Sequence, residues 1–223
     1  MIRIVLVDDQ ELFRGGVRVV LDAQPDMEVC GEAANGLEAL NVIEATRPDV
    51  ILLDMRMPVM DGVETVRALF GPEGPEVPPK VIVLTTFALD AAAATAIRAG
   101  ASGFLLKDST PAFLTAAIRA VDTGSAVIAP DELDQLFSAD VAAAPIPAKA
   151  PVPLEFRSLT TRERAIFDLA ARGLSNAEIA AREFVSESTV KSHISAVLGK
   201  LSLRDRVQLV VYAHDNKLLD GAV

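Results

Sequence analysis

Short apolar runs alternate with stretches of helical spacing through the first 122 residues of the chain. Five short, mainly apolar runs are predicted to be strands, at residues 3–8, 27–33, 50–54, 80–85 and 103–106. Between and after them, apolar residues at helical spacing predict helices at residues 10–23, 35–47, 61–70, 90–99 and 111–122. The alternation predicts an α/β domain.

Five successive strand–helix units are typical of a parallel sheet with helices on both faces. Right-handed crossovers favour a flavodoxin-like, doubly wound, five-stranded order, which binds ligands at the carboxyl ends of its strands. The residues at or just beyond those ends are acidic or polar: Asp8, Asp9, Asp54, Thr85 and Lys107. We therefore expect these five side chains to meet in one crevice.

The pattern changes after residue 123. Residues 138–158 are rich in alanine and proline without helical spacing, which indicates a semi-extended linker, whereas 124–137 either extend the first domain or begin that linker. Helical spacing then returns and predicts a small all-α domain of four helices, with helix-turn-helix spacing around residues 184–186. We expect domains at 1–123 and 158–223, joined by a linker at 124–157.

Charge divides the chain in the same way. The net charge is −10, but residues 1–157 carry 12 basic and 23 acidic residues, whereas residues 158–223 carry 9 and 8. The acidity therefore belongs to the first part. The second part has a charge of +1, so it would have to meet DNA through local contacts rather than through bulk charge.

Cysteine content and hydropathy bear on the compartment. Cys30 is the single cysteine, so no disulfide forms within the chain, as is typical of a reducing cytosol. We find neither a signal peptide nor an apolar run of about 18 residues that would span a membrane. These features predict a cytoplasmic protein without a membrane partner.

Three carboxylates in the expected crevice would repel one another unless a cation lay between them. Oxygen ligands suit a hard ion such as Mg²⁺. An aspartate beside that ion can attack phosphorus, while the ion, Lys107 and the Thr85 hydroxyl stabilise the phosphoryl oxygens. Each residue alone has an ordinary explanation as a helix cap, a turn residue or a surface charge. Their joint placement at strand ends is what favours phosphoryl chemistry.

Residues 1–122 resemble a receiver domain of the two-component response regulators. The resemblance implies that Asp54 is the phosphoacceptor and that Thr85 and Lys107 act with it. It implies that Thr85 and Phe104 form the switch. It further implies a Mg²⁺ site made by Asp8, Asp9, Asp54 and the backbone carbonyl of Arg56. The motifs that carry it are Val7-Asp8-Asp9, Leu53-Asp54-Met55-Arg56-Met57-Pro58, Asp61-Gly62, Leu84-Thr85-Thr86 and Ala101-Ser102-Gly103-Phe104-Leu105-Leu106-Lys107.

The predicted helix that follows the turn at 184–186 has two chemically different faces. Its apolar stripe is Val190, Ile194, Val197 and Leu201. Small polar and basic residues lie mostly off that stripe, where they can face a DNA major groove. The candidate DNA contacts on this helix are Ser188, Thr189, Lys191, Ser192 and Ser195, with Lys200, Arg204 and Arg206 as candidate phosphate contacts. A solvated polar face remains the alternative.

This part resembles the LuxR-type domain of the NarL/FixJ-like response regulators. The motifs are Leu159-Thr160, Arg162-Glu163, Gly173-Leu174-Ser175-Asn176, Glu178-Ile179-Ala180, Ser188-Thr189-Val190-Lys191-Ser192-His193 and Lys200-Leu201. The two resemblances together imply a transcriptional regulator that a sensor histidine kinase phosphorylates at Asp54. They imply binding to double-stranded operator DNA, with a homodimer as the phosphorylated form.

Three alternative functions fit the sequence less well. A phosphatase with an aspartate nucleophile usually carries a second aspartate two residues later, where this chain has Arg56, which is a poor proton donor. A flavin carrier would need aromatic residues to stack the flavin ring. A vestigial receiver would not need the intact acidic set. We therefore expect a regulator rather than an enzyme, in which the bulky Phe87 slows dephosphorylation by hindering the attacking water.

Overall fold

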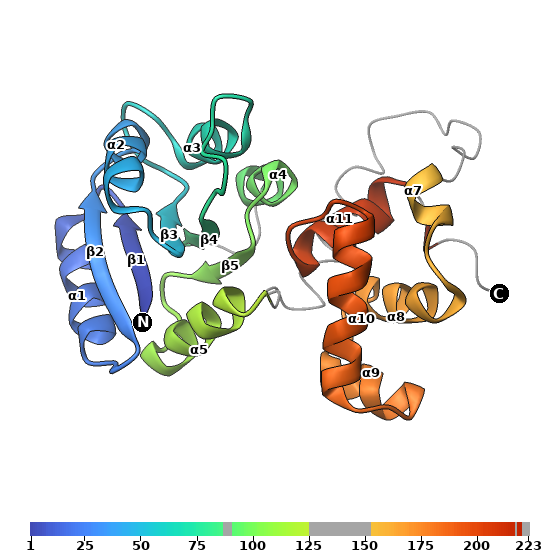
Figure 1. Cartoon of the computed structure of the whole chain (residues 1–223). Helices are drawn as coiled ribbons and strands as arrows, with labels where there is room; N and C mark the ends of the chain where they lie inside the picture. The colour runs from blue at the N-terminus through green and yellow to red at the C-terminus, as the bar shows by residue number, and fades with distance from the viewer. Residues whose placement is uncertain (87–90, 125–152, 217, 220–223) are drawn as a thin grey trace. The chain divides into compact units, whose positions relative to one another are not determined.

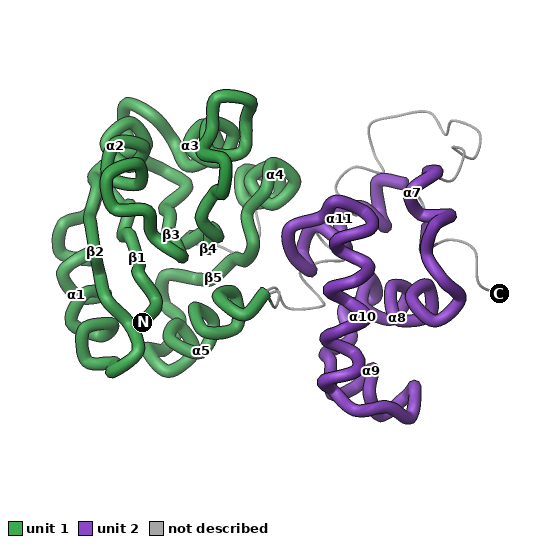
Figure 2. The backbone as a smooth tube through the Cα atoms, viewed as in Figure 1, with its two compact units in different colours: residues 1–128 green, residues 129–223 purple. Residues whose placement is uncertain are grey.

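The computed structural model describes residues 1–86, 91–124, 153–216 and 218–219. The chain divides into two compact units, residues 1–128 and residues 129–223 (Figure 2). Most of the predicted linker, at residues 125–152, lies outside the described residues. Phe87, and Asp90 at the start of the fourth predicted helix, also lie outside them.

The first unit contains a five-stranded parallel sheet, as the alternating pattern predicts. The strand order is β2-β1-β3-β4-β5, which is the doubly wound order. The central strand β3 is buried along its whole length, which explains why its sequence is an uninterrupted apolar run. The strands are β1 (Ile2–Val7), β2 (Met27–Ala33), β3 (Val50–Asp54), β4 (Lys80–Thr85) and β5 (Gly103–Leu106).

Five helices cover the two faces of this sheet (Figure 1). One apolar cluster joins α1 and α5 to alternate strand residues, including Ile4, Leu52 and Ile82. Helices α2, α3 and α4 lie on the opposite face, where Val5, Ile51 and other intervening strand residues are buried. The helices are α1 (Glu11–Asp22), α2 (Gly36–Thr46), α3 (Gly62–Phe70), α4 (Ala91–Ala99) and α5 (Pro111–Asp122), each within its predicted range.

The described part of the second unit is all-helical around its own core. Thr160 and Ser175 each begin a helix with the predicted capping box, in which Glu163 and Glu178 bond back to the cap. The helices are α7 (Leu154–Arg157), α8 (Thr161–Ala171), α9 (Asn176–Glu183), α10 (Glu187–Lys200) and α11 (Arg206–Asp215). No helix in the described part of the chain is both long and apolar enough to cross a membrane.

The short helix α7 differs from the sequence prediction of four helices that begin after residue 157. Phe156 is buried in the core of the second unit, and its ring meets the edge of Phe167 with centroids 5.0 Å apart. The proline-rich composition before it favours a linker, but a single aromatic side chain is enough to bind this segment to the domain.

Candidate functional site

The strand ends bring the predicted residues of the crevice together. Asp8 follows β1, Asp54 ends β3 beside Leu84 of β4, and Thr85 lies beside Leu106 of β5. Asp8, Asp54 and Thr85 are buried, whereas Asp9 is exposed. One carboxylate oxygen from each of Asp8, Asp9 and Asp54 lies within 4.8 Å of the other two. This spacing allows one cation to contact all three.

Lys107 bridges two of these carboxylates. Its Nζ lies 2.6 Å from Asp8 Oδ2 and 3.0 Å from Asp54 Oδ2. The Asp8 carboxylate is also held in position by its other oxygen, because Oδ1 accepts a hydrogen bond from the Gln10 backbone N–H at 2.9 Å. The lysine therefore sits where it could contact a phosphoryl group on Asp54 without a change of strand register.

Burial opposes the charged forms in this crevice. It raises the pKa of Asp54, although the Lys107 ammonium pulls in the opposite direction. Burial by itself would lower the pKa of Lys107, but hydrogen bonds to Asp8 and Asp54 raise that pKa overall. Lys107 consequently carries a fixed positive charge beside both carboxylates.

The loop between β3 and α3 fixes the backbone around Asp54. Gly62 donates its N–H to the Met55 carbonyl at 3.2 Å, and a Cβ at this glycine would lie 2.5 Å from the Asp54 backbone oxygen. Asp61 caps α3 by accepting a hydrogen bond from the Glu64 N–H at 2.8 Å. Val59 has φ 71°, so the loop turns tightly there. Arg56 occupies this loop with its side chain exposed.

The two predicted switch residues lie on neighbouring strands. The Thr85 carbonyl accepts a hydrogen bond from the Lys107 N–H at 2.7 Å, which joins the ends of β4 and β5. Phe104 pairs with Val83 across the same two strands and is 3 % exposed. Phe104, one of the two predicted switch residues, is therefore already buried in the receiver.

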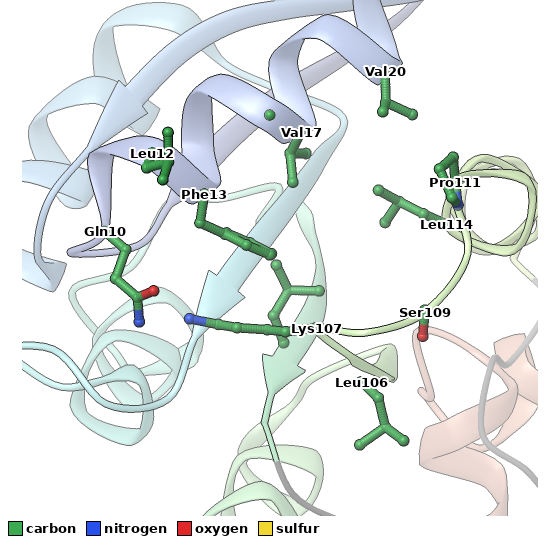
Figure 3. Close-up of a pocket in the computed structure, with 12 residues that line it drawn as sticks. Gln10, Leu12, Phe13, Val17, Val20, Leu106, Lys107, Ser109, Pro111 and Leu114 are labelled. Carbon is green, nitrogen blue, oxygen red and sulfur yellow. The ribbon is translucent and has the colours of Figure 1, made fainter.

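One neighbour of the crevice was not found by sequence reasoning. The Lys107 Nζ lies 4.8 Å from the ring centroid of Phe13 on α1, within the range of a cation–π contact (Figure 3). In the sequence, Phe13 is distinguished only as an apolar position of the helix predicted at residues 10–23. Nothing in the spacing could indicate that its ring would face the lysine.

Helix α10 has the two faces that its sequence predicts. Val190, Ile194, Val197 and Leu201 are buried in the core. Ser186 rather than Ser188 caps the helix, because its Oγ accepts a hydrogen bond from the Thr189 N–H at 3.1 Å. Of the candidate DNA contacts, Thr189 is half-buried and the others on this helix are exposed: Ser188, Lys191, Ser192 and Ser195.

The three candidate phosphate contacts lie in different environments. Arg204 is exposed. Lys200 is exposed as well, but its Nζ forms an ion pair with Glu163 Oε2 at 2.7 Å. That hydrogen bond, together with one from the Thr160 backbone N–H, lowers the pKa of Glu163 to about 2.

Arg206 departs from the expectation of a phosphate contact. Its guanidinium is buried and donates to the side chain of Asn176 at 2.9 Å and to the carbonyls of Ala170 and Leu174. This burial lowers the pKa of Arg206 to about 10. Because these acceptors occupy its donors, the structure gives Arg206 a role inside the domain.

Two family models match the chain and follow its division into two units. Residues 4–119 match the response regulator receiver domain, and residues 157–213 match the luxR family of bacterial regulatory proteins. The chain belongs to the response regulators. A receiver joined to a LuxR-type DNA-binding domain makes this response regulator a phosphorylation-dependent transcriptional regulator.

Full-length relatives have the same arrangement. The response regulator is 40 % identical to the transcriptional regulatory protein LiaR of Bacillus subtilis (strain 168), over 99 % of this chain and 100 % of LiaR. It is 35 % identical to the nitrate/nitrite response regulator NarL of Escherichia coli (strain K12), over 96 % of each chain. The crystal structure of the response regulator ChrA, of a heme-sensing two-component system, matches with TM-score 0.51 and 33 % identity, covering 97 % of this chain and 98 % of ChrA.

Proposed function

We propose that Asp54 accepts the phosphoryl group, from a sensor histidine kinase, and that this controls binding of the second domain to operator DNA. The observation that carries the assignment is the contact of the buried Asp54 with Lys107, at 3.0 Å, inside a cluster of three carboxylates. Asp8 and Lys107 are paired on one side, so the remaining carboxylate oxygens can serve a metal ion.

The residues of the crevice fit Mg²⁺. Asp8, Asp9 and Asp54 supply hard oxygen ligands within 4.8 Å of one another, and we assign the backbone carbonyl of Arg56 as a further ligand by resemblance. When bound, Mg²⁺ would neutralise the charge of the phosphoryl oxygens during transfer.

Asp54 would act as the nucleophile in that transfer. One of its carboxylate oxygens forms a bond to phosphorus as the bond from phosphorus to the donor imidazole nitrogen breaks, and that nitrogen then takes up a proton. Lys107 would move from Asp54 to a phosphoryl oxygen, and Thr85 would donate its hydroxyl proton to another. The movement of Thr85, with Phe104, would alter the surface formed by α4, β5 and α5.

The second domain would bind DNA in a way that depends on the phosphorylation of the receiver. We assign base or phosphate contacts to the exposed residues of α10 together with Thr189, and phosphate contacts to Lys200 and Arg204. Phosphorylation would either uncover α10 or cause two chains to dimerise. In the dimer, the paired DNA-binding domains would bind two half-sites of the operator in the cytoplasm. Operator binding by a phosphorylated protein that stays monomeric would count against the paired form.

Intact mass spectrometry after incubation with acetyl phosphate and Mg²⁺ tests the assignment. The wild type should gain one phosphoryl group, Asp54→Asn should gain none, and chelation of Mg²⁺ should prevent the gain. Asp61→Asn is the matched control, because the same change at a helix cap of the neighbouring loop should leave uptake intact. A phosphoryl group on Asp54→Asn would overturn the assignment.

A further inference from the structure

Two arginines on α1 share one carboxylate of the edge strand β2. Arg14 Nε lies 3.0 Å from Glu32 Oε2, and Arg18 Nε lies 2.6 Å from Glu32 Oε1. The arginines are four positions apart, so they lie on the same side of the helix, which packs beside β2 (Figure 1). Burial by itself would raise the pKa of Glu32, but hydrogen bonds from both arginines lower that pKa overall. Glu32 is therefore a fixed negative charge that orients both guanidinium groups.

Arg14 has a further contact that Arg18 does not make within the described residues. Its Nη1 donates a hydrogen bond to the backbone carbonyl of Asp8 at 2.6 Å. The Arg14 side chain is 14 % exposed, whereas that of Arg18 is 39 % exposed. A hydrogen bond from a charged donor is strong, and shelter from water strengthens it further. Arg14 thus ties the end of β1 to α1 and, through Glu32, to β2.

The carbonyl that Arg14 holds belongs to the peptide bond between two proposed Mg²⁺ ligands, Asp8 and Asp9. Because a peptide unit is planar, a fixed oxygen also fixes the direction in which the chain continues into Asp9. The Asp8 carboxylate has its own supports, from the Gln10 N–H and from Lys107. The Asp9 carboxylate is exposed and makes neither a hydrogen bond nor an ion pair with the described part of the chain. The position of Asp9 therefore depends on its backbone.

We propose that Arg14, oriented by Glu32, is a positioning residue for the divalent-cation site, an inference that rests on the proposed function. It fixes the peptide between Asp8 and Asp9, so that the Asp9 carboxylate stays close enough to Asp8 and Asp54 to share one cation. The positive charge of Arg14 by itself opposes the binding of a cation nearby. A favourable effect of Arg14 on cation binding must therefore come from geometry, which gives the proposal a definite sign.

Binding of Mn²⁺ to the full, unphosphorylated chain, measured from the electron paramagnetic resonance signal of the free ion, tests this role. Arg14→Gln removes the charge and the contact with Asp8. Arg18→Gln is the matched control, because it removes the same charge one turn later on α1, together with a bond to the same Glu32, but no contact with Asp8. Glu32→Gln has nearly the same shape as the wild type and keeps Arg14, but removes the charge that orients it.

Arg14→Gln should raise the Kd for Mn²⁺ by at least about tenfold, as is typical when a residue that supports a metal ligand is replaced. Glu32→Gln should raise it by a smaller factor, and Arg18→Gln should leave it unchanged or slightly lower. If charge alone mattered, both arginine variants would lower the Kd. A wild-type or lower Kd in Arg14→Gln would overturn the proposal, and a wild-type Kd in Glu32→Gln would overturn the orienting role of Glu32.

Phosphoryl uptake from acetyl phosphate supplies a second readout. Arg14→Gln should take up phosphoryl slowly at subsaturating Mg²⁺ but at the wild-type rate at saturating Mg²⁺, because Arg14 bonds to Glu32 and Asp8 and leaves Asp54 and Lys107 in place. A loss that saturating Mg²⁺ does not restore would overturn the proposal. Should circular dichroism show that Arg14→Gln does not fold, the Kd of Glu32→Gln decides. A wild type that binds no Mn²⁺ would instead overturn the proposed Mg²⁺ site itself.

Discussion

Replacing Arg206 with methionine is expected to lower the stability of the DNA-binding domain rather than to weaken its contact with DNA directly. Arg206 begins α11 and reaches across the domain to the carbonyls of Ala170 and Leu174 and to the side chain of Asn176. Methionine has a similar length but no donor. The carbonyls at the end of α8 would lose a buried charged partner, and the core would keep most of its volume.

The magnitude follows from those contacts. A hydrogen bond from a charged donor contributes about 1.5–3 kcal/mol. At the lower end of that range, losing the bonds to Asn176 and Leu174 lowers the free energy of unfolding by about 3 kcal/mol. In a domain of this size, each kcal/mol shifts Tm by roughly 4–8 °C, so Tm should fall by roughly 12–24 °C.

Tyrosine fluorescence isolates this transition. The chain has no tryptophan and one tyrosine, Tyr212, whose ring lies against Phe167 in the core of the DNA-binding domain with centroids 6.4 Å apart. Its emission during thermal unfolding therefore reports on that domain alone. Lys191→Ala is the matched control, because replacing this exposed residue should lower DNA affinity without changing Tm. The reasoning fails if Arg206→Met keeps the wild-type Tm but reduces the salt dependence of DNA binding by about one counterion, as loss of a phosphate contact would.

Three other changes test separate parts of the structure. The ion pair with Lys200 holds the pKa of Glu163 near 2, below the ordinary value of 4.5. The stabilisation of the domain by this ion pair is therefore complete above pH 4.5 and is lost as the pH falls toward 2. Glu163→Gln should therefore flatten the decline of Tm in that pH range, and an unchanged slope would contradict the assignment. Phe184 is 94 % exposed at φ 55°, a conformation that favours asparagine or glycine, so Phe184→Asn should stabilise the domain by about 1 kcal/mol in urea unfolding. If the urea midpoint did not rise, the backbone of this turn would not be strained by phenylalanine. Gly62→Val should impair phosphoryl uptake and lower receiver stability by about 2–3 kcal/mol, because its Cβ would overlap the backbone of Asp54. Wild-type uptake rates would refute that steric argument.

The receiver could be predicted from the sequence nearly to the residue. Strand pattern and strand-end chemistry depend on local runs such as Val50–Asp54, and the parallel topology then forces Asp8, Asp54 and Thr85 to one edge. The buried stripe of α10 was equally readable, because helical spacing alone separates Val190 from Lys191. These features are determined by periodicity, and periodicity is visible in a single sequence.

The tertiary partners of charged and aromatic residues could not be predicted from the sequence in the same way. Arg206 follows Arg204 and Asp205 in the sequence, and only the folded domain brings the end of α8 to its guanidinium. Phe156 follows a proline-rich stretch, so composition favoured a linker although the ring belongs to the core. Both cases depend on long-range packing, for which the sequence around each residue carries no local signal.

The separation of the two faces of α10 bears on how such a regulator diverges. The residues that hold the helix in place are buried, and Ser188, Lys191, Ser192 and Ser195 are exposed and absent from the core. Substitutions at these four positions should cost little in folding, since exposed sites away from caps and cores change stability by about 0.5 kcal/mol or less. After gene duplication, a copy could acquire a new operator by changing these positions while keeping its scaffold, and its receiver could retain the old signal or acquire another independently.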